Sequence, residues 1–493
     1  MAKYLMALDQ GTTSSRCILF TREGIPVSIA SREYEQIFPN DGWVEHNPME
    51  IFSSQASVAV EALHKIGATW RDVSCIGITN QRETVIVWDK NTGKPIYNAI
   101  VWQCRRTAEF CENLKADGKE KFIKERTGLV LDPYFSASKI KWILDNVEGA
   151  RELADNGSLI CGTVDTWLMW NLSDRSIFAT DASNASRTML FNIHTLDWDD
   201  ELLEIFGIPR SMLPEVKPSC GIFGYTSRDI FGEELPISGV AGDQQAAMFG
   251  QGCFNKGDIK NTYGTGGFLL MNIGNKAIIP KSGLLTTVAW KIGEDVTYAS
   301  EGSVFVCGAA IQWLRDGMKI IETAAETEEI SIKAKSNGGV YVVPAFCGLG
   351  APHWDPYARG AILGITRATT REHIVRATVE SMAYQTNDLI SAMKEECGIN
   401  LSCIKVDGGA ANNNFLLSFQ ADISGVTVKR PICTETTALG AALMAGLGIG
   451  EFSSLEEISK ISKTEREFLP CASEDIKFEL LNGWADAVNR TKS

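Results

Sequence analysis

Residues Asp9 to Ser14, with the sequence Asp-Gln-Gly-Thr-Thr-Ser, combine the groups that bind a phosphate. Gly11 lets the backbone approach a ligand closely. Successive N–H groups and the hydroxyls of Thr12, Thr13 and Ser14 can surround phosphate oxygens. Asp9 stands at the end of an apolar, strand-like run, where it can hold Mg²⁺ directly or through water. An ordinary glycine-containing hairpin turn also explains this segment, and the motif alone does not separate the two.

A second copy of this turn favours the phosphate interpretation. Residues 258–263 and 268–273 read as strands around the Gly-Thr-Gly-Gly turn at 264–267. Glycine-threonine turns on two domains can hold one triphosphate between them. Later in the chain a strand ends in Asp-Gly-Gly at 407–409, and a helix begins there. The diglycine allows a flat base or a ribose to lie against the backbone, and the helix N-terminus adds donors.

Two adjacent charged residues, Arg82 and Glu83, follow another strand-like run. A small polyol needs a forked donor, a fixed acceptor and an apolar wall, because its hydroxyls donate and accept while its carbon faces are apolar. Arg82 and Glu83 supply the first two, and Trp102, Tyr134 and Phe268 can supply the wall. Adjacent strand residues point to opposite faces, so both charges reach one ligand only where the strand gives way to a loop. Spacing alone favours a surface ion pair with scattered core aromatics.

The elements that must position these residues alternate between strands and helices, which is typical of α/β domains. In the first half, the expected strands cover residues 4–8, 16–20, 73–79, 85–88, 96–102 and 237–241. In the second half, Thr369 and Glu372 predict a capping box for a helix that reaches about Met393. A change of pattern after Gly250 divides the chain into domains at 1–250 and 251–493.

Composition restricts the class of protein. A chain of 493 residues is too long for one core, and 44% hydrophobic with 22% charged residues is typical of a globular protein. A net charge of −14 argues against a general nucleic-acid binder, but not against one bound nucleotide. The 13 Cys include no Cys-x-x-Cys pair and no secretory leader is evident, so we expect reduced thiols, a cytoplasmic protein and no stable membrane insertion.

Three segments resemble the FGGY family of carbohydrate kinases, within the superfamily of actin, hexokinase and the heat-shock ATPases. Residues 134–142, with Asp145 and Asn146 after them, are similar to one family signature, and residues 360–380 are similar to the other. The segment 77–84, Gly-Ile-Thr-Asn-Gln-Arg-Glu-Thr, is similar to the hallmark of the members that act on glycerol. The resemblance covers nearly the whole chain.

This resemblance implies an α/β fold class with two ribonuclease-H-like (actin-like ATPase) domains and an interdomain catalytic cleft. The domain over 1–250 would contain the glycerol site and the first phosphate loop, and the domain over 251–493 the second phosphate loop and the adenosine site. The implied reaction is the ATP-dependent phosphorylation of glycerol to sn-glycerol 3-phosphate, which begins glycerol catabolism, with Mg²⁺ as cofactor. We also expect a homo-oligomer, either a dimer or a tetramer.

The resemblance assigns residues to each ligand. The residues that match glycerol contacts are Arg82, Glu83, Trp102, Tyr134, Asp243, Gln244 and Phe268. The residues that match nucleotide contacts are Thr12, Thr13, Ser14, Arg16, Thr265, Gly308, Gln312, Gly409 and Asn413. Asp9 matches the carboxylate that holds Mg²⁺. Arg16 has an alternative explanation as a charge at a strand edge.

Asp243 is the expected general base. It follows a buried strand at the N-terminus of a helix, which favours the ionised carboxylate and predicts a weak base. Phosphoryl transfer has a loose transition state in most analyses, so the alcohol need not lose its proton early. Orientation of the alcohol by Asp243 can therefore matter as much as basicity. A helix cap is the alternative role.

Two other functions stay open. One is an FGGY kinase that acts on a pentulose or on gluconate, although the three aromatics around Arg82 and Glu83 predict a small pocket. The other is a nucleotide-switched binding protein of the actin or chaperone type. No separate peptide-binding segment follows the kinase-like core, which argues against that function.

Overall fold

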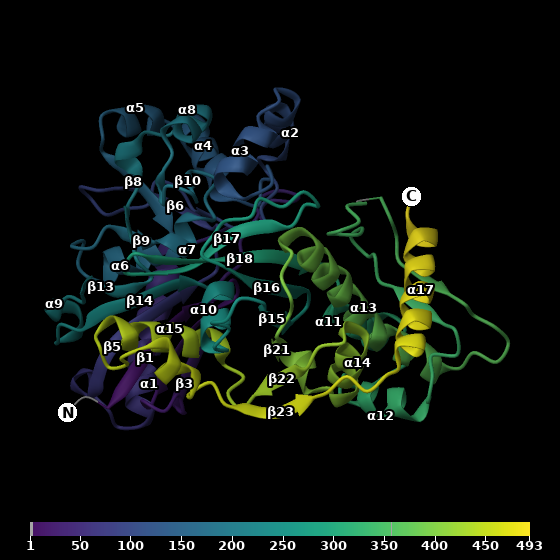
Figure 1. The fold of residues 1–493 in the computed structure, drawn as a ribbon. Coiled ribbons are helices and arrows are strands. Elements are labelled where there is room, and N and C mark those ends of the chain that lie inside the picture. Colours follow the sequence, from purple (N-terminus) through teal and green to yellow (C-terminus); the bar gives the residue numbers. More distant parts are fainter. Residues whose placement is uncertain (1–2, 356) are drawn as a thin grey trace.

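Thirteen strands form one sheet that runs through the molecule (Figure 1). The computed structural model describes residues 3–355 and 357–493. At one end of the sheet the strand order is β3 (Pro26–Glu33), β2 (Ser14–Phe20), β1 (Tyr4–Gln10), β5 (Val73–Asn80) and β14 (Pro236–Gly242). Strands β3, β2 and β1 form two antiparallel pairs, and β5 is parallel to both β1 and β14.

The far end of the sheet repeats this order with strands of the second half. Its order is β18 (Asp295–Val304), β16 (Gly267–Gly274), β15 (Asp258–Tyr263), β21 (Cys403–Asp407) and β22 (Val428–Pro431). The directions repeat as well, with antiparallel pairs first and then β21 parallel to both β15 and β22. The two ends are joined through β17 (Leu285–Ile292) and β13 (Cys220–Tyr225), and β23 (Thr464–Phe468) lies outside β22. The repeat seen in the two glycine-threonine turns is therefore a repeat of the fold.

Two helices that follow equivalent strands pack against each other between the repeats. These are α10 (Asp243–Gly250) and α15 (Thr436–Gly448), and α15 also lies across β14, β5 and β1 (Figure 1). The approach is close because glycines face the helix backbone. A Cβ at Gly77 would lie 2.1 Å from the carbonyl oxygen of Ala441, and one at Gly440 would lie 1.8 Å from that of Ala246. The Ala- and Gly-rich composition of α15 thus serves backbone contact between the two halves.

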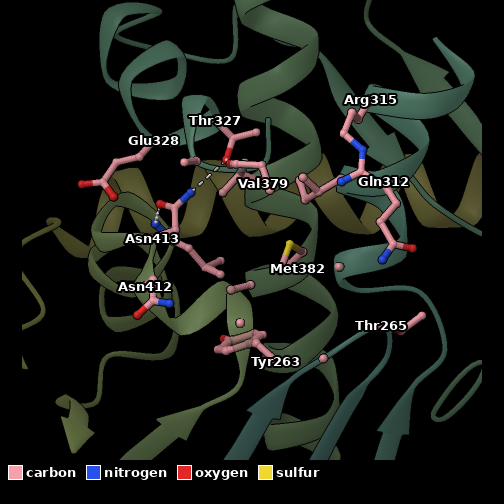
Figure 2. A pocket seen from close by; sticks show the side chains of 18 residues that line it. Tyr263, Thr265, Gln312, Arg315, Thr327, Glu328, Val379, Met382, Asn412 and Asn413 are labelled. Carbon is pink, nitrogen blue, oxygen red and sulfur yellow. Dashed lines mark hydrogen bonds between the residues drawn. The ribbon is translucent and has the colours of Figure 1, made fainter. Parts of the chain in front are cut away.

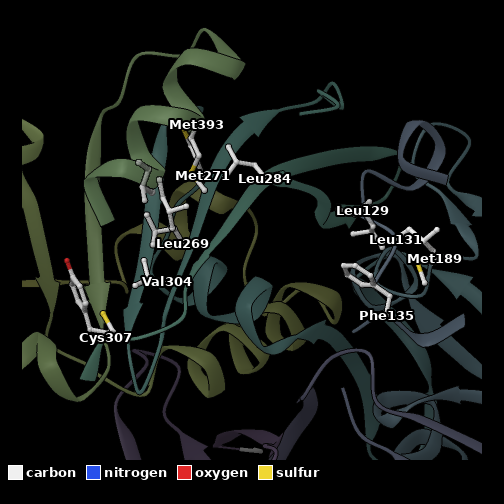
Figure 3. Packing of buried hydrophobic residues seen from close by; sticks show 14 of the residues in the cluster. Leu129, Leu131, Phe135, Met189, Leu269, Met271, Leu284, Val304, Cys307 and Met393 are labelled. Atoms are coloured by element: carbon white, nitrogen blue, oxygen red, sulfur yellow. The ribbon is translucent and has the colours of Figure 1, made fainter. Parts of the chain in front are cut away.

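Buried apolar side chains from both halves of the chain form the hydrophobic core (Figure 3). Met393, on α13 (Arg371–Cys397), lies with Leu269 and Met271 of β16 in the largest buried cluster, which also includes Phe135 of the first half. This burial anchors the strands whose ends carry the polar residues described below. Among the described residues, no helix has the length and apolar character needed to cross a membrane.

Two local predictions were wrong. The strand expected over 96–102 is only β7 (Ala99–Ile100), a short member of a four-stranded sheet with β4 (Glu45–His46), β6 (Val85–Asp89) and β8 (Leu159–Thr163). The N-cap of α13 is Thr370, paired with His373, one residue later than predicted. The hydroxyl of Thr369 instead accepts a hydrogen bond from the N–H of Thr366 at 2.9 Å in the preceding turn.

Candidate active site

Asp243 lies where β14 ends and α10 begins. Its Oδ1 is 3.3 Å from Nε of Arg82 and accepts the N–H of Gln244 at 2.7 Å. Burial raises the pKa of Asp243, while the charges of Arg82 and Lys260 lower it, and the net pKa is raised. The helix terminus alone predicted a lowered pKa and a weak base. Burial outweighs it, so Asp243 is a stronger base than an ordinary aspartate.

Arg82 and Glu83 belong to a buried cluster of four charges. Arg82 donates to Glu301 through Nη1 at 2.7 Å and Nη2 at 2.9 Å. Arg187 donates from Nε to Glu83 at 2.6 Å and from Nη2 to Glu301 at 3.1 Å. All four side chains are buried. The surface ion pair that spacing favoured is therefore wrong.

The backbone at Glu83 explains how two adjacent residues share one site. Strand β5 ends at Asn80, so Arg82 and Glu83 lie in the following loop. Glu83 has a φ of 61°, in the left-handed region that non-glycine residues rarely adopt. This turn breaks the strand alternation, and both side chains join one network. Backbone strain of this kind is common at functional sites, although seven other described non-glycine residues also have a positive φ.

The charges of the cluster stabilise one another. Burial alone would raise the pKa of Glu301, but Arg187 and Arg82 lower it to about 2. Burial lowers the pKa of Arg82, but the charges of Glu301 and Glu83 raise it by more. The net pKa of Arg82 lies well above its ordinary value. Sequence reasoning missed Arg187 and Glu301. The available signal was a single charge inside each of two runs of small and apolar residues, 182–190 and 299–304.

Aromatic residues connect this cluster to the first glycine-threonine turn. The rings of Trp102 and Tyr134 meet edge to face with centroids 5.5 Å apart. Trp102 donates from Nε1 to the hydroxyl of Thr12 at 2.9 Å. Thr13 is exposed and Ser14 partly exposed beside it. The structure thus brings a predicted nucleotide residue and two predicted glycerol residues together.

A buried lysine connects Asp243 to the second hairpin. Lys260, on β15, donates to the side-chain oxygen of Gln244 and lies 3.5 Å from the carbonyl oxygen of Phe268. Burial lowers the pKa of Lys260, and Asp407 and Asp243 raise it. Sequence reasoning missed this residue, because a lysine in a strand before a turn is common on protein surfaces.

Five predicted nucleotide residues line one cavity of about 510 Å³ in the second half of the chain. Figure 2 shows Thr265 and Gln312 on one side of the cavity and Asn413 on the other, with Met382 between them. Asn413 caps α14 (Asn414–Ser424) and donates to the hydroxyl of Thr327 at 3.1 Å. The other two predicted residues in its lining are Gly308 and Gly409. Thr327, Glu328 and Arg315 also line it and were not predicted.

A third group of predicted residues lies apart from that cavity. Asp9 and Arg16 face each other across β1 and β2 and form an ion pair. Arg16 also donates to Glu435, just before α15, at 2.8 Å. Arg16 therefore links the two halves of the chain through two carboxylates. These contacts give it a structural role beyond that of a charge at a strand edge.

Two acidic residues of the first repeat, Asp9 and Asp243, have the chemistry of magnesium ligands. Mg²⁺ bound with a nucleotide uses one or two carboxylates, phosphate oxygens and water. Asp9 stands near the end of β1 and Asp243 directly after β14, two strands that flank β5, and Asp9 is near enough to raise the pKa of Asp243. Over residues 3–355 and 357–493, no group of three or more His, Cys, Asp or Glu could hold a metal alone. The donor set fits an ion held chiefly by nucleotide phosphates.

Comparison with known proteins defines the class. The chain matches the N-terminal domain of the FGGY family of carbohydrate kinases over residues 4–250 and the C-terminal domain over 259–449. It therefore belongs to the FGGY family of carbohydrate kinases. The expected two-domain, actin-like ATPase fold is confirmed.

Relatives similar to nearly the whole chain include two bacterial proteins. "Glycerol kinase 2" of Thermotoga maritima is 60% identical over 489 residues, 99% of each chain. "Glycerol kinase" of Caldanaerobacter subterraneus subsp. tengcongensis is 60% identical over 490 residues, again 99% of each. The solved Plasmodium falciparum glycerol kinase with ADP has a TM-score of 0.95 at 36% identity, covering 99% of this chain and 98% of that one. A gluconate kinase from Lactobacillus acidophilus, at 21% identity and TM-score 0.89, shares the fold.

Proposed function

We propose that this chain transfers the terminal phosphate of ATP to glycerol and forms sn-glycerol 3-phosphate. Full-length relatives at 60% identity that are named glycerol kinases support the substrate. The observation that carries the proposal is the 3.3 Å approach of Arg82 Nε to Asp243 Oδ1. This proximity supports the proposal, because a guanidinium can bind polyol hydroxyls and the adjacent carboxylate can accept the alcohol proton.

The proposed glycerol contacts come from the first half of the chain and from Phe268 on β16. Arg82 donates to glycerol hydroxyls, and Glu83 and Gln244 complete the polar contacts. The apolar face of glycerol lies against Trp102, Tyr134 and Phe268. Because the charged partners of Arg82 and Glu83 are already in place, these two side chains reorganise little when glycerol binds.

Asp243 acts as the general base and orients the attacking hydroxyl. Its raised pKa suits the acceptance of a proton near neutral pH better than that of an exposed aspartate. The transition state is loose, so positioning contributes alongside basicity. Closure of the two halves after glycerol binds would exclude water, which is a smaller competing nucleophile.

The nucleotide lies between the two turns. Thr265 contacts its phosphates from the second half, and the first-half contacts come from Thr12, Thr13, Ser14 and Arg16. The remaining contacts, from Gly308, Gln312, Gly409 and Asn413, lie in the cavity of about 510 Å³. Mg²⁺, held by Asp9 and the phosphates, would neutralise charge on the transferred group.

We also propose a domain boundary, a compartment and an oligomeric state for the chain as a whole. Its two family units divide at residues 250 and 251, before β15. The protein functions in the cytoplasm, and it assembles as a homo-oligomer, either a dimer or a tetramer. Sedimentation of the purified protein gives the oligomeric state directly, and a monomer at assay concentration would contradict the last proposal.

The experiment is a coupled ADP-release assay with glycerol, xylulose and gluconate in parallel. We expect rapid turnover with glycerol, and Asp243→Asn serves as the inactive control. Faster turnover of xylulose would replace glycerol with a pentulose. ATP hydrolysis that is independent of any alcohol would favour a nucleotide-switched binding protein.

A further inference from the structure

Lys139 is a buried cation that the proposed reaction does not use. It lies in the first turn of α4 (Ser136–Asn146), with no exposed surface. Its Nζ donates to the carbonyl oxygens of Pro133 at 2.6 Å, Tyr134 at 2.6 Å and Phe135 at 2.9 Å. In the part of the chain that the structure describes, Lys139 forms no ion pair with a carboxylate.

This position is unfavourable for a lysine. Burying an ammonium without an opposite charge costs free energy, and the positive end of a helix dipole adds to that cost. Burial lowers the pKa of Lys139 to about 8, although nearby Glu83 raises it. An apolar side chain would occupy the same space without these penalties. The role of the ammonium must therefore be sought in the three carbonyls that it binds.

Those carbonyls belong to the segment that presents Tyr134. The N–H of Tyr134 donates to Asp132 Oδ1 at 2.8 Å, and its carbonyl accepts from Lys139. Asp132 is itself held by Arg105 at 2.8 Å. Both backbone groups of Tyr134 are thus fixed, and its ring lies edge to face with Trp102.

We propose that Lys139 is a positioning residue of the glycerol site, whose ammonium gathers the carbonyls of residues 133–135 and thereby holds Tyr134 against Trp102. The inference rests on the proposed function, because it takes Tyr134 as part of the glycerol wall. Without the ammonium, two buried carbonyls and one partly buried carbonyl lose this donor, and the segment relaxes away from the site. Glycerol affinity then falls, while the distant nucleotide cavity is unaffected.

The first test compares Lys139→Met with Lys141→Met. Lys141 lies on the same helix, is partly exposed and pairs with Asp145 at 2.8 Å, so it is a matched control. We expect KM for glycerol to rise about tenfold in K139M, because the variant loses hydrogen bonds from a charged group. KM for ATP should be unchanged in K139M. K141M should behave like the wild type. An unchanged KM for glycerol in K139M would overturn the inference. A wild-type protein that does not phosphorylate glycerol would instead overturn the proposed function.

A double-mutant cycle separates positioning from general destabilisation. If Lys139 acts through Tyr134, adding K139M to Y134A produces no further rise in KM for glycerol. Independent effects that multiply in the double variant would mean that Lys139 supports the fold only, and would overturn the proposal.

If K139M fails to fold, the pH dependence of KM for glycerol in the wild-type protein tests the positioning role of Lys139. The titratable groups that face Lys139 are Glu83, Asp132, Cys104 and Cys111. Loss of the Lys139 proton weakens its hold on the carbonyls, so KM for glycerol rises above about pH 8, and this rise is absent from Y134A. A flat wild-type profile, or an equal rise in Y134A, would contradict the assignment.

Discussion

The two glycine-threonine turns are alike in sequence and different in surroundings. In the first turn, the hydroxyl of Thr12 already accepts a hydrogen bond from Trp102, beside the predicted glycerol wall. In the second turn, Thr265 is exposed and lines an open cavity. On the proposed assignment, one turn joins the phosphate region to the alcohol site, and the other faces the nucleotide. A repeated motif can thus acquire separate roles from the residues packed around it.

Charge distribution separates the same two regions. Beside the first turn, the buried side chains of Arg82, Glu83, Arg187 and Glu301 bind one another. The cavity beside the second turn is lined mainly by small, apolar and amide residues, with Arg315 and Glu328 as its charged members. We infer that the alcohol site is preorganised, whereas the nucleotide region forms most of its polar contacts with the ligand itself.

Removing a charge should therefore have unequal effects on stability in the two regions. Glu301→Ala leaves two buried guanidiniums without their shared partner and should lower the free energy of unfolding by about 3–5 kcal/mol. Glu328→Ala removes bonds to Asn414 at the partly exposed rim of the nucleotide cavity and should cost about 1 kcal/mol. Urea denaturation measures both. Equal losses would contradict a preorganised alcohol site.

The next largest effect is expected at Asp243, between the regions. Asp243→Asn removes the proton acceptor and should lower kcat by about 10²-fold or more. Calorimetric titration should show retained ATP binding, since the cavity that holds Gln312 and Asn413 is unchanged. Wild-type turnover in D243N would exclude Asp243 from the mechanism.

The pH dependence of kcat/KM for glycerol sharpens the same assignment. Asp243 accepts a proton only when ionised, so activity is retained above its pKa and lost below it. Because burial raises that pKa, the acid decline should begin above the ordinary pKa of an aspartate. Each pH unit below the pKa should cost about tenfold. A decline that begins only at the ordinary value would refute the raised pKa.

The smallest effects compare the turns directly. Thr12→Val removes both the acceptor of Trp102 and a proposed phosphate contact, so it should raise KM for glycerol and KM for ATP, each roughly two- to tenfold, the worth of one neutral hydrogen bond. Thr265→Val should raise KM for ATP by a similar factor and leave KM for glycerol unchanged. Each variant is the control for the other in initial-rate assays. Identical patterns from the two variants would mean that the turns are not specialised.

Sequence predicted the parts of the site that depend on local signals. Strand ends and turn residues identified both turns, the Arg82–Glu83 pair and the start of the helix at Asp243. The partners of that pair were missed because Glu301 lies 219 residues from Arg82 and Arg187 lies 104 residues from Glu83. One sequence carries no pairing signal over such separations. The prediction of a strand over 96–102 was wrong because most of these apolar residues lie in loops on either side of the two-residue strand β7.

The most direct measurement is a structure of the complex with glycerol, Mg²⁺ and a non-hydrolysable ATP analogue. We expect a terminal glycerol hydroxyl about 2.6–3.2 Å from Asp243, with the terminal phosphate between residues 11–14 and Thr265. Glycerol bound away from Arg82 and Asp243, or a terminal phosphate that contacts neither turn, would contradict this expectation.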